Sequence, residues 1–150
     1  MAQGFPTALE NRLMAMLKPL REFGMDTEFL CKIADLNPTE ASAPDYDDGD
    51  WAPLTNRVLK RDQGVTWIRT RVTVPEKCAD LPIEGSQLRV AAENGGHFFA
   101  PIDIYIDGRL ALSERSWMDF KCPEGILTES AVPGQVHTIA MRFDLNEKCD

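Results

Sequence analysis

The sequence predicts a mainly β fold, a β-sandwich of jelly-roll type preceded by an amphipathic helix. Three observations predict it. Apolar and polar residues alternate in several short segments after residue 57, turn-forming residues separate these segments, and no helical spacing lies between successive segments, which argues against a parallel α/β sheet. A length of 150 residues with 43% hydrophobic content fits one compact domain. We divide it into a helical segment (1–36), an acidic loop (37–56) and a β-sandwich (57–150).

The first expected element is an amphipathic helix with a signal at each end. Thr7 is a suitable N-cap and Glu10 follows three residues later, which makes a capping box, and Gly24 can end the helix in a left-handed conformation. One helix face is apolar and carries Leu9, Leu13, Met16, Leu20 and Phe23. A second, weaker helical pattern over residues 26–36 places Phe29, Ile33 and Leu36 on one side.

The stretch from Asn37 to Asn56 indicates a loop. Proline and glycine interrupt it, and it contains no Lys or Arg. Its acids carry five of the eight net negative charges of the chain and are Glu40, Asp45, Asp47, Asp48 and Asp50. These charges favour a solvated loop. Trp51, a large apolar residue among them, is expected to anchor the loop to the body of the domain.

Strands are expected at residues 65–74, 87–93, 102–107, 109–112 and 135–145, where the hydrophobic period is two. The first has an apolar face and a second, mixed face that carries Trp67, Arg69 and Arg71. Asp107-Gly108 supplies the two-residue type I′ turn of a hairpin. His137 shares a face with Ile139, which indicates a hydrogen-bonded, partly buried histidine.

No catalytic or metal-binding motif is present, so we expect no catalytic residue, no metal and no cofactor in this chain. The two histidines, His97 and His137, have no metal-ligand spacing, and a zinc site made of Cys78, His97, Cys122 and Cys149 would need ligands from four separate segments. The acidic run from Asp45 to Asp50 has the oxygen density that calcium prefers, but it lacks the EF-hand order of glycine and glutamate. A solvated loop is the favoured interpretation, with calcium as the alternative.

Four aromatic residues near the expected loops are candidates for stacking against a sugar ring: Trp51, Trp117, Phe98 and Phe99. The alternative interpretation, that they fill the ends of the sandwich core, is favoured because an aromatic ring buries a large area.

Two segments resemble the N-terminal sandwich domains of large glycoside hydrolases. Residues 66–75 (TWIRTRVTVP) resemble a W-x-R-x-x-x-x-V-P strand, and residues 104–108 (IYIDG) resemble the hairpin of those domains. Family 2 β-galactosidases and β-glucuronidases usually follow the hairpin with G-x-H-x-G-G-y, whereas this chain has residues 112–117 (LSERSW). The leading helix and the segment 126–134 (ILTESAVPG) are closer to family 38 α-mannosidases.

The resemblance covers residues 8–145 and implies a galactose-binding-like sandwich at the front of an α-mannosidase. That family's catalytic domain uses zinc, an aspartate nucleophile and an H-x-D motif, and because this chain has no H-x-D, no catalytic residue carries over. The implied role is non-catalytic, namely shaping or stabilising a catalytic domain of the same polypeptide. The alternatives are a free-standing carbohydrate-binding module and a scaffold domain with a protein ligand.

Composition sets the remaining expectations. A net charge of −8 disfavours nucleic acid as a partner, and no apolar run reaches the length of a membrane span. Four widely spaced cysteines and the lack of a signal peptide predict reduced thiols in a cytoplasmic protein. Any carbohydrate binding is expected to be weak. A weak homodimer, favoured by salt, is expected if the isolated domain exposes an apolar patch.

Overall fold

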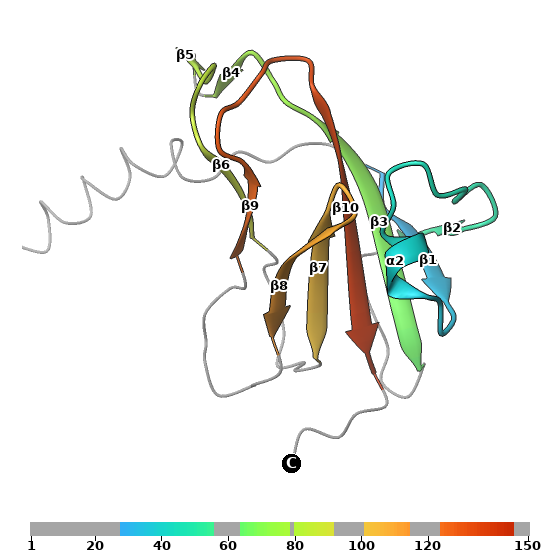
Figure 1. Cartoon of the computed structure of the whole chain (residues 1–150). Coiled ribbons are helices and arrows are strands. Elements are labelled where there is room, and N and C mark those ends of the chain that lie inside the picture. The colour runs from blue at the N-terminus through green and yellow to red at the C-terminus, as the bar shows by residue number, and fades with distance from the viewer. Residues whose placement is uncertain (1–27, 56–63, 79, 92–100, 115–123, 146–150) are drawn as a thin grey trace, which may run out of the picture.

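The computed structural model describes residues 28–55, 64–78, 80–91, 101–114 and 124–145. Its main layer is a six-stranded antiparallel sheet with the order β2-β1-β3-β10-β7-β8 (Figure 1). The strands are β1 (Leu30–Ile33), β2 (Ala52–Pro53), β3 (Val65–Thr73), β7 (Ile102–Ile106), β8 (Arg109–Glu114) and β10 (Val136–Asp144). The long central strands β3 and β10 pair over nine residues each, so they form the backbone of the sheet.

A second layer covers one face of this sheet. It consists of the two-stranded sheet β6 (Leu88–Ala91) and β9 (Glu124–Thr128), with the short hairpin β4 (Lys77–Cys78) and β5 (Leu81–Pro82) near its end (Figure 1). The core between the layers is apolar and includes Val72, Ile104, Ile139, Leu88 and Leu127. The predicted mainly β, sandwich-like fold is therefore confirmed.

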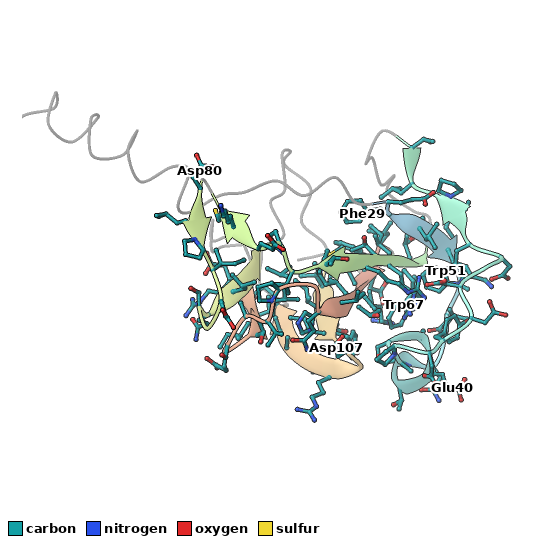
Figure 2. The ribbon with its side chains drawn as sticks, turned by 90° about the horizontal axis from the view of Figure 1, so that it is seen from above. Phe29, Glu40, Trp51, Trp67, Asp80 and Asp107 are labelled. Carbon is teal, nitrogen blue, oxygen red and sulfur yellow. The ribbon has the colours of Figure 1, made fainter. Side chains whose placement is uncertain are left out.

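Part of the opposite face of the six-stranded sheet is covered by residues 37–51, which we call the strap. The strap begins with a single helical turn, α2 (Pro38–Ala41), and Figure 2 shows this turn, labelled at Glu40, on one side of the sheet. Asn37 caps the turn by accepting a hydrogen bond from the Thr39 N–H, and Pro38 stands in the first turn, where its missing N–H costs nothing.

The helix predicted over residues 26–36 is wrong for the described part, residues 28–36. Residues Leu30–Ile33 form β1, which lies between β2 and β3 and pairs with Thr66–Arg69. The apolar spacing of this stretch suits a helix, but the free N–H and C=O groups at the edge of β3 give it more hydrogen bonds as a strand. The leading helix predicted over residues 8–23 lies outside the described residues.

The segment predicted as a solvated loop is also different in the structure. It contains α2 and β2, and its carboxylate Asp48 is buried against the sheet instead of facing water. The expected anchoring role of Trp51 is confirmed. Its side chain is 5% exposed and packs between the strap and the sheet, against Trp67 and Ala140.

The other strand predictions hold, with small shifts of their ends. The Asp107-Gly108 turn has positive φ at both residues, 49° and 79°, as a type I′ turn requires. Besides β1 and β2, three further strand pieces were missed: β4, β5 and β9. Two of these have only two residues each, too short to show a period. In the part of the chain that the structure describes, no helix is long and apolar enough to cross a membrane.

Candidate functional site

Several polar and aromatic side chains of the described residues lie together on the strap side of the six-stranded sheet. Strand alternation directs Trp67, Arg69 and Arg71 of β3 to this side, together with Ala140 and Arg142 of β10. The strap lies over part of this face. Side chains under the strap are occupied by contacts with it, and only side chains beside the strap are open to a ligand.

Arg69 lies at the centre of the covered part and is 1% exposed. Its Nε donates to Asp48 Oδ2 at 2.9 Å, and its two terminal nitrogens donate to the carbonyl oxygens of Ala41 and Ala43. The guanidinium carbon also lies 5.4 Å from the centre of the Tyr46 ring. Each nitrogen of the guanidinium therefore donates to the strap, and Arg69 is a clamp that holds the strap on the sheet.

Asp48 also forms an ion pair with Arg71, a second arginine of β3. Arg71 Nη1 lies 3.2 Å from Asp48 Oδ1 and 3.0 Å from Oδ2. Burial alone would raise the pKa of the Asp48 carboxyl, but the hydrogen bonds from Arg69 and Arg71 and their positive charges outweigh it and lower the pKa below its ordinary value. Asp48 is therefore ionised at neutral pH and bound by two cations.

The lowered pKa of Asp48 predicts how stability depends on pH. The stabilisation by this carboxylate is fully present above its unfolded pKa of about 3.9 and is lost as the pH falls through the lower folded-state pKa. We expect wild type to be more stable than Asp48→Asn at pH 7, and the difference to shrink below about pH 4. Urea unfolding of both chains across this range is the measurement. A difference that stays constant to the lowest pH would contradict the pairing.

The aromatic residues of this face form one layer around Ala140. Trp67 is fully buried, and its ring centre lies 5.9 Å from that of Tyr105. In the sheet register Ala140 stands opposite both Arg69 and Tyr105, and its small side chain leaves room for the two rings to meet. Trp51 and Tyr46 of the strap pack edge to face at 5.8 Å.

Trp51 was a candidate for stacking against a sugar or for filling an end of the sandwich core, and the structure buries it in the separate apolar cluster on the strap side of the sheet. Its ring is buried between Tyr46, Arg69 and the sheet, so it has no open face for a pyranose. The other candidates, Trp117, Phe98 and Phe99, lie outside the described residues.

Beside the strap, the sequence analysis missed a second polar cluster, formed by Asp103, Ser113 and Arg142. The Ser113 hydroxyl donates to Asp103 Oδ1 at 2.6 Å. Arg142 lies 3.8 Å from Asp103 and 3.9 Å from Asp144, and its buried Nε has no partner in the described residues. Alternation alone places these side chains on one face. Their proximity depends on β7 lying between β10 and β8, which no local pattern reveals.

His137 is hydrogen-bonded as expected through Nδ1, but it is buried, and its Nε2 has no partner among the described residues. It is 4% exposed, and its Nδ1 lies 2.6 Å from Asp107 Oδ2. Asp107 Oδ1 accepts a bond from the Thr138 N–H at 2.8 Å, so both carboxylate oxygens are occupied. Asp107 and His137 therefore join the β7–β8 turn to β10, a structural role that also fixes the conformation of the turn.

The acids proposed as an alternative calcium site do not converge. Asp48 binds the two arginines, Asp50 lies 2.6 Å from the Lys32 ammonium, and Asp47 accepts from the Gly49 N–H. Among the residues that the structure describes, no three His, Cys, Asp or Glu side chains are grouped closely enough to hold a metal ion. Of the four residues considered for zinc, only Cys78 is among those described, as a free buried thiol.

Comparison with known proteins gives a structural likeness only. No protein-family model matches the chain, and no curated protein sequence matches it. Among solved structures, a β-glucuronidase of Faecalibacterium prausnitzii matches 82% of this chain with a TM-score of 0.52 and 17% identity. A β-glucuronidase of Ruminococcus gnavus matches 79% of it with a TM-score of 0.44 and 15% identity.

These matches have a limited extent in the other proteins. The chain spans 22% of the Faecalibacterium protein and 20% of the Ruminococcus protein, about a fifth of each. At 17% identity the first match establishes that this chain shares a fold with one part of a β-glucuronidase.

Proposed function

We propose that this chain is a non-catalytic sandwich domain of a sugar-cleaving enzyme. The observation that carries the proposal is the fold shared over 82% of the chain with about a fifth of a solved β-glucuronidase. The described polar groups support it, because Arg69, Arg71 and Asp48 bind one another and His137 binds Asp107. Such groups stabilise a fold and are not available to attack a glycosidic bond.

The sequence motifs favour an α-mannosidase of family 38 as the parent enzyme, and the solved structures are β-glucuronidases. Both substrate classes therefore belong in the test. In either case the chemistry would reside in a catalytic domain of the same polypeptide, and this domain would shape or stabilise it. We propose a cytoplasmic location, on the basis of the sparse cysteines.

A free-standing carbohydrate-binding module is the second candidate. The cluster of Asp103, Ser113 and Arg142 favours it, because the buried Asp103 contacts both Arg142 and Ser113, Ser113 is exposed on β8, and hydroxyl and guanidinium groups bind sugar hydroxyls. No zinc or other cofactor is proposed for either role. If the chain is the non-catalytic domain of an enzyme, any sugar binding at a shallow site should be weak, with a dissociation constant in the range of about 1 mM, whereas a free-standing module should bind more tightly.

We expect the purified 150-residue chain to hydrolyse neither an aryl α-mannoside nor an aryl β-glucuronide, with or without added zinc. We also expect glycosidase activity to accompany the chain when it is tagged at its native locus and purified, at a mass that includes a catalytic domain. Activity assays and mass spectrometry are the measurements. Turnover by the purified chain that survives controls would refute the non-catalytic role.

Recovery of the tagged protein without any glycosidase, together with micromolar binding of mannose or glucuronate oligosaccharides, would instead establish the module. Arg142→Ala is the informative variant in that case, because it should abolish such binding. Its control is Arg89→Ala, whose side chain is exposed on the other layer and pairs with Glu124.

A further inference from the structure

Strand β8 is the outermost strand on its side of the six-stranded sheet among the strands that the structure describes. Three successive residues, Arg109, Leu110 and Ala111, are exposed, and so is Ser113. Strand β9 approaches β8 from the inner face, where Gly125 lies against Ala111, but the two strands belong to different sheets. An exposed edge of this kind offers backbone hydrogen-bonding groups to another strand.

The direction of the backbone groups of β7 follows from one hydrogen bond at its end. The Asp107 N–H donates to Thr138 O on β10. Because the backbone groups of successive strand residues point to opposite sides, those of Ile106 and Ile104 point away from β10 and toward β8. The partners of these two residues on β8 therefore direct their own N–H and C=O groups inward.

Those partners are Arg109 and Leu112, and the register between them contains a bulge at Ala111. The outward-facing backbone groups of β8 consequently belong to Leu110 and Ser113. In a regular strand such groups recur every second residue, but here they are three residues apart. A regular strand can match both positions only by placing one of its residues opposite two of β8, as β7 does on the other side.

We propose that β8 pairs with the β8 strand of a second copy of this chain, antiparallel and around a two-fold axis perpendicular to the sheet. The second copy has the same extra residue, so its outward groups are also three residues apart. Leu110 then lies opposite the second copy's Ser113, and Ser113 lies opposite the second copy's Leu110. The two copies then have equal numbers of residues between their paired positions, so neither strand needs a further bulge, and this favours a second copy over an unrelated strand.

The charges of β8 support the same register independently. When Leu110 lies opposite Ser113, Arg109 lies opposite Glu114 of the second copy, and the two-fold axis repeats this pair. Arg109 and Glu114 both belong to the inner-face set of β8, since they pair with Ile106 and Ile102, so the opposite charges meet on one face of the joined sheet. Leu110, which is 56% exposed, would be partly covered.

The contact is short and its ion pairs are near water, so a weak dimer is expected. Salt would screen both the repulsion between two copies of net charge −8 and the attraction of Arg109 for Glu114. Variants are therefore best compared at one near-physiological salt concentration.

The test is sedimentation equilibrium of the 150-residue chain over a series of concentrations. Wild type should show a reversible monomer–dimer equilibrium, and Arg109→Glu should raise its dissociation constant by about tenfold, since two attractive pairs become repulsive. The double variant Arg109→Glu/Glu114→Arg should restore wild-type association, because it exchanges the charges and keeps the register. Arg89→Glu changes the net charge as Arg109→Glu does but lies on β6, and should stay within about twofold of wild type.

Three results would overturn the proposal. A strict monomer at the highest soluble concentration would mean that the edge is closed. Equal weakening by Arg109→Glu and Arg89→Glu would show an effect of net charge alone, and a double variant as weak as the single one would exclude this register. None of these results depends on whether the chain belongs to a glycosidase.

Discussion

Replacing Arg69 with methionine is expected to lower the free energy of unfolding by about 3–5 kcal/mol, the usual cost of removing one partner of a buried ion pair. The loss arises because Asp48 would keep only Arg71, whose side chain is 45% exposed, and because the carbonyl oxygens of Ala41 and Ala43 would lose their donors beneath the strap. Urea unfolding followed by circular dichroism is the measurement.

Arg89→Met is the matched control for this prediction. Arg89 also lies in a strand and forms an ion pair, with Glu124 at 3.3 Å, but its side chain is 57% exposed. An exposed pair of this kind contributes about 0–1 kcal/mol. If both variants lost the same small amount, Arg69 would not be the clamp of the strap, and the strap would be held by its apolar contacts alone.

Replacing Trp67 with alanine is expected to cost about 3–5 kcal/mol, the range measured for truncation of large buried aromatic residues. Trp67 is completely buried at the centre of the layer that joins the strap to the sheet. Its removal would leave a cavity beside Ala140, which is too small to fill it, and would end the ring contact with Tyr105. Thermal and urea unfolding, again by circular dichroism, give the difference.

Val136→Ala is the control for the cavity. Val136 lies on β10 and shares the strap side of the sheet, but it is 56% exposed, so its truncation should change stability by less than about 0.5 kcal/mol. A loss below about 1 kcal/mol for Trp67→Ala would mean that the strap collapses into the vacated space. That outcome would make the aromatic layer deformable, in contrast to the close packing inferred here.

The two replacements also separate two ways of holding the strap. Arg69 acts through directed hydrogen bonds to Asp48 and the strap backbone, so its contribution should fall in acid together with that of Asp48. Trp67 acts through apolar burial, which does not depend on protonation. Unfolding of the Arg69→Met and Trp67→Ala variants below about pH 4 should therefore show a smaller loss for the first and an unchanged loss for the second.

For the proposed role in a larger enzyme, these contacts mean that the strap side is largely committed to the fold of the domain itself. The surface that remains available on this side is the part beside the strap, with Ser113 and Leu110 exposed on β8. The paired edge proposed for β8 adjoins this part. A joined sheet would place the two Asp103–Ser113–Arg142 clusters on the same side of the dimer.

The sequence by itself determined the elements whose cause is local. Strands β3, β7, β8 and β10 show the period of two, and Asp107-Gly108 has the residues that a type I′ turn requires, so each was predictable within a few residues. Trp51 and His137 were also assigned correctly, because a large apolar ring in an acidic segment and a histidine in line with Ile139 both indicate contact with the core.

Only the tertiary structure decided the nature of β1, the course of the strap and the partners of the charged residues. The spacing of Phe29, Ile33 and Leu36 suits a helix, and only the open edge of β3 makes β1 a strand. An arginine that alternates with apolar residues looks the same in sequence whether water or protein covers its face. Asp48 and Arg69 are 21 positions apart, and their contact exists because the strap folds back over β3, where the low polarity of a buried site makes an unpaired charge too costly to remain.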